Sequence, residues 1–170
     1  MKAKLVLDNG KEIDVELSTE QLAEIQAKKK TGYERVNKGE TYYLAISETE
    51  DGYLDTFDKY GESDELFYEG ANYYNDETLA ENNARADQLM RQLRRFAVEN
   101  SEEELDWNNI NQLKYYCCYD YHNKELISPL AYHLRDFGNI YFDSEKTCQK
   151  AIEEFKDELI WFFTEYKDRV

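Results

Sequence analysis

Apolar and polar residues alternate at the start of the chain. The alternation covers residues 3–7 and returns over residues 13–17, with Asp8-Asn9-Gly10 between the two runs. Successive side chains of a strand point to opposite faces, and Asn-Gly is a preferred turn between paired strands. The pattern therefore predicts a β-hairpin over residues 3–17.

A short helix is predicted directly after this hairpin. Ser18 and Gln21 have the spacing of a helix-capping pair, and Gly32 is a typical stop signal. Residues 1–31 are therefore predicted to form a ββα unit. A unit of this size buries too little apolar surface to be stable alone, so we expect it to pack on the remainder or on a partner.

The remainder contains two stretches that resemble each other. Residues 42–46 (YYLAI) resemble residues 115–119 (YYCCY), and residues 70–77 resemble residues 138–145. In both copies of the second pattern an aromatic pair precedes an Asn or Asp that can cap a helix. We therefore predict an internal repeat.

A long helix is predicted at the end of each copy, because apolar residues recur there at helical spacing. The first helix is predicted from residue 76 to about 99, and the second from residue 144 to about 168. The apolar stripe of the first consists of Leu79, Ala86, Met90, Leu93 and Ala97, and that of the second of Cys148, Ile152, Phe155, Leu159, Phe162 and Tyr166.

These elements predict an α+β protein. The two copies, about residues 40–99 and 112–170, are each predicted to contain a β-hairpin, a short connecting strand and a long helix. An antiparallel sheet with both long helices on one face would bury both apolar stripes. We therefore predict two parts, an N-terminal ββα unit over residues 1–31 and an α+β domain over residues 32–170.

Negative charge is concentrated in one segment of the chain. The formal net charge is −16, and residues 47–69 hold nine acidic residues against a single base, Lys59. Aromatic residues are interleaved with these acids, which is typical of a folded acidic surface, because disordered acidic chains are poor in aromatic residues. Residues 99–106 form a second acidic run without a base. The residues that we predict to contact a partner are Glu48, Glu50, Asp51, Asp55, Asp58, Glu62, Asp64 and Glu65.

The charge also narrows the class of partner. Nucleic acids and anionic membranes are bound through clustered Lys and Arg, so the acidic balance argues against direct binding to either. It favours fast, salt-sensitive association with a basic protein. The N-terminus has no apolar run long enough for a signal peptide, and three cysteines do not form a secreted disulfide framework. We therefore predict a cytoplasmic location.

Three runs of the chain resemble a known group of proteins. They are DETLAENNARADQLMRQLRRFAVEN, LDWNNINQLKYY and FGNIYFDSEKTCQKAIEEFKDELIWFFTEYKD. Over about residues 32–170 the chain resembles small acidic proteins of phages and mobile elements of Gram-positive bacteria, mostly of unknown function. The resemblance implies a phage context. Small acidic phage proteins include inhibitors of host defence, notably anti-CRISPR proteins, some of which imitate nucleic acid.

Candidate catalytic and metal-binding residues are few. The chain has no nucleophile elbow, phosphate-binding loop or glycine-rich dinucleotide turn, so we predict a non-enzymatic protein without a cofactor. Cys117 and Cys118 are adjacent, and neighbouring residues of a strand point to opposite faces, which disfavours a shared metal ion. Cys148 lies on a helix stripe, where a thiol packs as a small hydrophobe. The residues of the zinc-site alternative are Cys117, Cys118, His122, His133 and Cys148.

The predicted function is stoichiometric binding to a basic host protein, such as the RNA-guided nuclease of a defence system. DNA carries one charge per ~1.7 Å of axis, so a rigid row of carboxylates could compete for the same basic groove. One alternative is a structural or accessory phage protein whose acidity only confers solubility, with a homo-oligomer formed through residues 159–163 (LIWFF). Another is a small zinc-stabilised domain. We expect LIWFF, which is apolar around the whole helix, to pack beneath the N-terminal unit.

Overall fold

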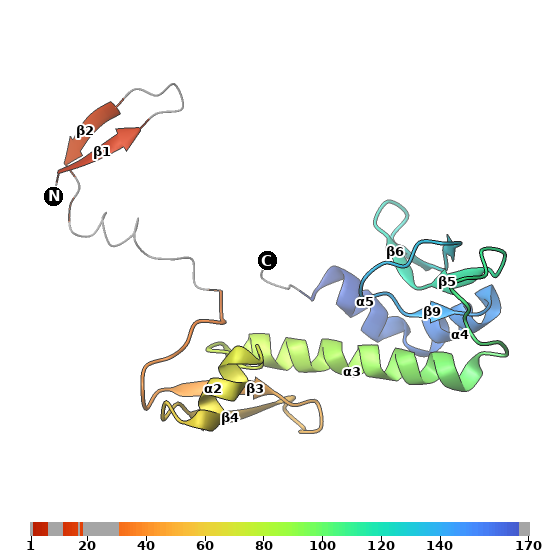
Figure 1. Cartoon of the computed structure of the whole chain (residues 1–170), viewed down its shortest axis with the longest axis horizontal. Helices are drawn as coiled ribbons and strands as arrows, with labels where there is room; N and C mark the ends of the chain where they lie inside the picture. The colour runs from red at the N-terminus through yellow and green to blue at the C-terminus, as the bar shows by residue number, and fades with distance from the viewer. Residues whose placement is uncertain (1, 7–11, 17, 19–30, 167–170) are drawn as a thin grey trace.

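The structure is a computed structural model that describes residues 2–6, 12–16, 18 and 31–166. Within these residues the chain combines small antiparallel sheets with four helices (Figure 1). The predicted α+β class is confirmed. The predicted single sheet is not observed, because the described strands form four separate small sheets.

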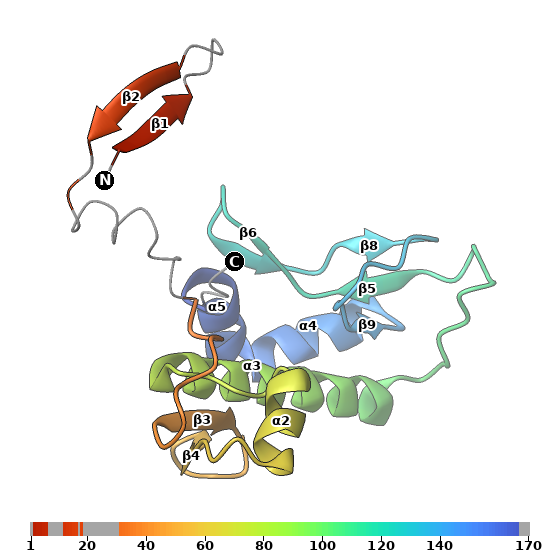
Figure 2. The same cartoon turned by 60° about the vertical axis from the view of Figure 1, so that its left-hand side comes forward.

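Strands β1 (Lys2–Val6) and β2 (Glu12–Glu16) form the predicted N-terminal hairpin. They are antiparallel, with Lys2 opposite Glu16. The predicted turn at residues 8–10 and the predicted helix after Ser18 lie outside the described residues. In both views the hairpin lies apart from the remaining elements (Figure 1, Figure 2). The predicted division of the chain at residue 31 stays a prediction.

Helix α3 (Glu77–Asn100) lies in the middle of the molecule. Residues 31–76, which we call the first half, pack on one side of it, and residues 101–166, the second half, pack on the other (Figure 1, Figure 2). The Asp76 carboxylate accepts a hydrogen bond from the Leu79 N–H at 2.9 Å and caps the helix as predicted. α3 therefore connects the two halves.

The first half contains a β-hairpin and a short helix. Strands β3 (Thr41–Ala45) and β4 (Tyr53–Phe57) are antiparallel, and the turn between them contains Gly52 at φ 73°. Glycine is favoured at this left-handed conformation. Helix α2 (Glu62–Glu69) follows, where the sequence predicted only a short strand. Its one buried residue is an aspartate, so it has no apolar stripe by which the sequence could reveal it.

The second half contains short strands and two helices. β5 (Lys114–Tyr116) is the centre of a three-stranded sheet with β8 (Leu130–Ala131) and β9 (Tyr141–Phe142) at its sides. β6 (Cys118–Asp120) pairs with β7 (Glu125–Ile127) in a separate hairpin. The helices are α4 (Glu145–Glu154), capped by the Ser144 side chain, and α5 (Lys156–Thr164).

Two adjacent aromatic residues precede each of α3 and α4, and in both places the backbone of these residues pairs with an earlier strand. Tyr74 exchanges two backbone hydrogen bonds with Tyr43, at 2.8 and 2.9 Å. Phe142 lies opposite Tyr115 in the pairing of β9 with β5. The other partners of the two strands differ, since β3 pairs with the five-residue strand β4, whereas β5 pairs with the two-residue strand β8. The two-copy repeat therefore stays a prediction.

The second predicted long helix is divided at Phe155, where the backbone leaves helical geometry (φ −106°, ψ 22°). The Phe155 ring packs edge-on against Phe96 of α3, with 5.7 Å between the ring centroids. The break lets α4 and α5 run in different directions while both contact the core. Spacing of apolar residues does not reveal it, because the stripe continues through both helices.

The largest apolar core lies between α3 and the second half. It contains buried side chains from α3, β9, α4 and α5, namely Leu89, Leu93, Phe96, Ala97, Phe142, Cys148, Ala151 and Leu159. The stripe predicted for α3 is buried at Leu79, Ala86, Leu93 and Ala97, and half-buried at Met90. Among the described residues, every helix is too short or too polar to cross a membrane.

Candidate functional site

The predicted partner-binding acids occupy two kinds of environment. Asp58 and Asp64 are buried, with 0% and 8% of their surface exposed. The other six, Glu48, Glu50, Asp51, Asp55, Glu62 and Glu65, are exposed. A buried carboxylate is costly unless it accepts hydrogen bonds inside the protein, so the two groups must have different roles.

Asp58 is held by three donors within the first half. Its carboxylate accepts hydrogen bonds from Arg35 Nε at 2.9 Å, from the Tyr73 hydroxyl at 2.8 Å and from the Tyr60 N–H at 2.6 Å. Burial by itself would raise the pKa of Asp58, but these bonds outweigh it and lower that pKa. Asp58 is therefore a charged anchor inside the fold.

Asp64 joins the start of α2 to β3. Its carboxylate accepts hydrogen bonds from the N–H groups of Gly61 and Lys59, both at 2.9 Å, and from the Tyr42 hydroxyl at 2.8 Å. The Gly61 bond is the main cause of the lowered pKa of Asp64. Because Gly61 is the residue that caps α2, this aspartate fixes both the start of the helix and its position on the hairpin.

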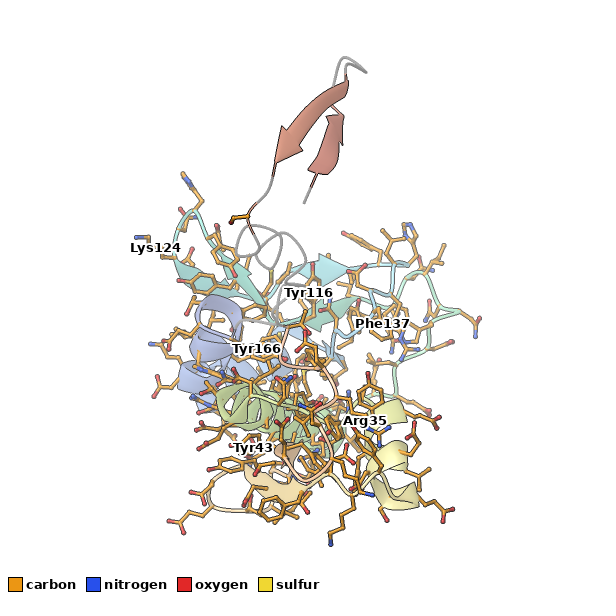
Figure 3. All side chains as sticks on the ribbon, turned by 90° about the vertical axis from the view of Figure 1, so that its left-hand side faces the viewer. Arg35, Tyr43, Tyr116, Lys124, Phe137 and Tyr166 are labelled. Atoms are coloured by element: carbon orange, nitrogen blue, oxygen red, sulfur yellow. The ribbon has the colours of Figure 1, made fainter. Side chains whose placement is uncertain are left out.

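Arg35 links Asp58 to α2. Besides Asp58, its guanidinium binds Glu65, and it lies over the rings of Tyr60 and Tyr68, with 4.7 and 5.4 Å to the ring centroids (Figure 3). The hydrogen bond to Asp58, followed by that to Glu65, raises the pKa of Arg35. The network holds residues 31–40, the hairpin and α2 together.

Asp58, Asp64 and Glu65 therefore have partners within the chain, and their contact with a partner protein stays a prediction. The carboxylates of Asp58 and Asp64 are turned inward, and that of Glu65 is bound by Arg35. A carboxylate paired inside the chain offers little net charge to another protein. The charge pattern of the sequence does not separate such residues from those that face solvent.

A groove of about 380 Å³ lies between the β3–β4 turn, α3 and α5, and we call it the acidic groove. It contains Glu50 and Asp51 from the predicted set and adds Glu81 of α3 and Glu158 of α5. The polar groups beside these acids are hydroxyls and amides that can accept hydrogen bonds. The complete lining is Ser47, Thr49, Glu50, Asp51, Gly52, Glu81, Arg85, Gln88, Leu89, Gln92 and Glu158.

Arg85 is the one cation among the residues that line the acidic groove, and its charge is neutralised there. Its Nε and Nη2 donate to the two carboxylate oxygens of Glu158 at 2.8 and 2.9 Å, and this pairing raises the pKa of Arg85. The guanidinium also lies 3.9 Å from the ring centroid of Trp161. Within the described part of the chain, Glu50, Asp51 and Glu81 form no ion pair. The groove therefore has an excess of negative charge.

Glu48 belongs to a neighbouring groove that has more basic than acidic residues. Its carboxylate is 3.8 Å from Arg91, and both side chains are well exposed. This second groove, of about 590 Å³, is lined by Ser47, Glu48, Gln88, Arg91, Gln92 and Arg95. Because two arginines face one glutamate here, the face of α3 changes from acidic to basic along its length. Glu48 therefore adds little to the negative charge of the acidic groove.

The remaining predicted acids lie elsewhere on the surface. Asp55 is on β4 opposite Tyr43, and Glu62 is in the first turn of α2. Neither lines the acidic groove. The second acidic run is exposed throughout, at Glu99, Glu102, Glu103, Glu104 and Asp106. Of the eight predicted residues, the structure thus brings only Glu50 and Asp51 together in this groove.

The residues of the zinc-site alternative are not assembled into one site. Cys117 and Cys148 lie side by side, whereas the Cys118 sulfur lies 3.9 Å from the Tyr119 carbonyl oxygen. His122 and His133 are both exposed. Across the described residues, no group of three or more Cys, His, Asp or Glu side chains is placed to hold a metal ion.

The apolar run at residues 159–163 packs in part against α3 and in part against the second half. Leu159 and Trp161 are buried, and the Phe163 ring lies against Tyr119 with 6.4 Å between centroids. The Tyr121 hydroxyl also donates to the Phe163 carbonyl oxygen. The expectation that the N-terminal unit packs on this run stays a prediction, because the helix predicted for that unit lies outside the described residues.

Two groove residues, Glu81 and Glu158, were not predicted from the sequence. Glu81 is four residues before Arg85, a spacing that suggests an ion pair along the helix. The structure instead pairs Arg85 with Glu158, 73 residues away. A contact between residues so far apart has no local signal in a single sequence.

Comparison of the chain with protein-family models, curated proteins and solved structures finds no match. The resemblance to phage proteins, and the functions that it implies, therefore stay predictions. We infer function from the shape and charge of the acidic groove alone.

Proposed function

We propose that this chain is a non-enzymatic binding protein that receives a basic side chain of a protein partner in the acidic groove. The observation that carries the proposal is the convergence of Glu50, Asp51 and Glu81 on one groove. Within the described residues these carboxylates have no cation of their own, and the adjacent Arg85 is neutralised by Glu158.

The groove fits the chemistry of a guanidinium or ammonium group. Arginine presents five N–H donors in a planar fork, and lysine presents three. The carboxylates supply charged acceptors, while the amides of Gln88 and Gln92 supply neutral ones. An exposed ion pair contributes about 0.2–1 kcal/mol, so several carboxylates around one cation are needed for a stable contact.

The partner class that this surface favours is a protein that binds nucleic acid through a basic channel. Such channels present clustered Lys and Arg to a phosphate backbone, and RNA-guided nucleases are examples. The exposed acids at residues 99–106 add negative charge on another part of the surface. We propose that the chain competes with nucleic acid for such a channel in the cytoplasm of a host cell.

Displacement of labelled duplex DNA from a guide-loaded RNA-guided nuclease tests this proposal. We expect the wild-type chain to displace DNA at low salt and to lose affinity at high salt. The groove variant Glu50→Gln/Asp51→Asn/Glu81→Gln should bind at least about tenfold more weakly, equivalent to about 1.4 kcal/mol.

A matched control removes three charges outside the groove. Glu102→Gln/Glu103→Gln/Glu104→Gln changes net charge by the same amount on exposed side chains. We expect it to weaken binding less than about threefold, which is within the range of peripheral charges. Equal losses for both variants would show that diffuse charge, and not the groove, governs binding. If no DNA is displaced at low or at high salt concentration, the result would support the structural-protein alternative.

A further inference from the structure

The second half brings two cysteines from different elements into contact. Cys117 lies between β5 and β6, and Cys148 lies in α4, yet their Sγ atoms are 3.8 Å apart. A disulfide bond has a length of about 2.05 Å, so the sulfurs need to approach by about 1.8 Å to form one. Rotation of the two side chains can supply a movement of this size.

The two thiols differ in their access to small molecules. Cys148 is completely buried, whereas Cys117 is half-buried and lines an apolar cavity of about 260 Å³. The cavity is bordered by Leu93, Phe142, Phe162 and other apolar residues, and by Phe137 on an exposed loop at the edge of the second half (Figure 3). A small apolar reagent can therefore reach Cys117 through the cavity, while Cys148 does not line it.

The electrostatic environment also indicates that Cys117 reacts before Cys148. A hydrogen bond with Cys117 and burial raise the pKa of the Cys148 thiol, which disfavours its thiolate. The thiolate is the species that attacks a disulfide. Cys117 is therefore the sulfur that reacts first, and Cys148 is positioned to react with the product.

We propose that Cys117 and Cys148 form a reversible dithiol–disulfide site that is oxidised by a small organic disulfide entering the apolar cavity. Cys117 loses its proton to solvent, and its sulfur attacks one sulfur of the reagent. The bond between the reagent sulfurs breaks, which releases one small thiol and leaves a mixed disulfide on Cys117. Cys148 then loses its proton and attacks the Cys117 Sγ, which releases the second small thiol. Two protein thiols are oxidised to one disulfide, and one reagent disulfide is reduced to two thiols.

The bond would tie α4 to the junction of β5 and β6. It would close the loop between residues 117 and 148, which restricts the unfolded chain and therefore favours the folded state. The acidic groove is lined by other residues, so its binding activity is not expected to change. The site is thus a regulator of the stability of the second half.

Titration with an aromatic dipyridyl disulfide tests the proposal, because each thiol released from the reagent absorbs light. The Cys118→Ser variant keeps only the proposed pair. We expect it to release two reagent thiols per chain, to carry no adduct, and to lose the mass of two hydrogen atoms. Its unfolding temperature should rise on oxidation and return after reduction. A tryptic digest of wild type should join peptide 147–150 to peptide 115–124.

Further variants separate the two sulfurs. Cys118→Ser/Cys148→Ala should release one reagent thiol and keep the mixed disulfide on Cys117. Cys117→Ser, which retains Cys118 and Cys148, should form no internal cross-link. The proposal is overturned if Cys118→Ser retains reagent adducts after exhaustive titration, if it reacts only after unfolding, or if its cross-link joins two chains. The wild-type digest does not depend on the folding of any variant.

Discussion

The two halves that pack on opposite sides of α3 are held together by different kinds of contact. In the first half, Asp58 and Asp64 are buried and accept hydrogen bonds from an arginine, tyrosine hydroxyls and backbone N–H groups. In the second half, the buried core against α3 is apolar and includes Phe142, Cys148, Ala151 and Leu159. The ion pair between Arg85 of α3 and Glu158 of α5 is partly exposed. The first half thus combines smaller apolar clusters with buried polar pairing, whereas the second half rests mainly on one larger apolar core.

The difference shows why acid content is an incomplete guide to a binding surface. Residues 47–69 hold the densest acidic run of the chain, yet part of this charge is used to position α2 on the hairpin. The carboxylates available to a partner are those that the fold leaves without internal cations. In the acidic groove these are Glu50, Asp51 and Glu81.

The largest expected effect is in the second half. Phe142→Ala removes a ring with 0% exposure from the core between α3 and the second half. We expect the free energy of unfolding to fall by about 3–5 kcal/mol, as for other buried Phe→Ala changes. Denaturant titration followed by tryptophan fluorescence reports this, because Trp107 and Trp161 both lie in the second half. Phe137→Ala, at a fully exposed ring, is the control and should change stability by less than about 0.5 kcal/mol.

A smaller loss is expected when the polar pairing of the first half is disrupted. Asp58→Asn preserves shape but removes the charge that pairs with Arg35. We expect a loss of about 1–3 kcal/mol, since buried donors lose their charged acceptor. The control Asp55→Asn removes the same charge from an exposed residue of β4 and should be near neutral. An equal loss in both variants, measured by denaturant titration, would contradict the division into buried and exposed acids.

Lowering the pH should weaken the hydrogen bonds that the carboxylates of the first half accept, before it affects apolar packing. Hydrogen bonds from the Thr31 N–H, and from further donors, lower the pKa of Glu34 from 4.5 to about 2. The unfolded chain therefore binds more protons than the folded chain below about pH 5, so stability is expected to fall as pH drops towards 2. Denaturant midpoints across this range measure the slope. Glu34→Gln should flatten it, whereas Glu69→Gln, at an exposed position, should not.

Much of the fold follows from local patterns. The N-terminal pairing, the cap at Asp76, the start of the second helix at Ser144 and the apolar stripe of α3 were predicted, because each signal lies within a short stretch of sequence. The cap of α4 is Ser144 itself, where the sequence predicted an Asn or Asp. Helix α2 was missed because it is held by Asp64 and has no buried apolar residue. The break at Phe155 was missed because the apolar stripe continues through both helices, and the contact of its ring with Phe96 is distant in the sequence.

The candidate site was harder to predict than the fold. Charge density identified Glu50 and Asp51, but it also selected Asp58 and Asp64, whose burial depends on Arg35 and on tyrosines distant in the sequence. Glu81 and Glu158 gave no separate signal, since they join the groove only through the packing of α3 and α5. A single sequence specifies which residues are charged, whereas tertiary structure decides which charges remain unpaired.

The central claim is that the acids of the groove serve binding while Asp58 serves folding. The most direct measurement is the free energy of unfolding of Glu50→Gln/Asp51→Asn/Glu81→Gln beside that of Asp58→Asn, both relative to wild type. We predict that the groove variant is as stable as wild type within about 0.5 kcal/mol, or slightly more stable. The reason is that the substitutions remove neighbouring carboxylates, which repel one another. A loss as large as that of Asp58→Asn would show that the groove carboxylates hold the fold together, and would contradict the account.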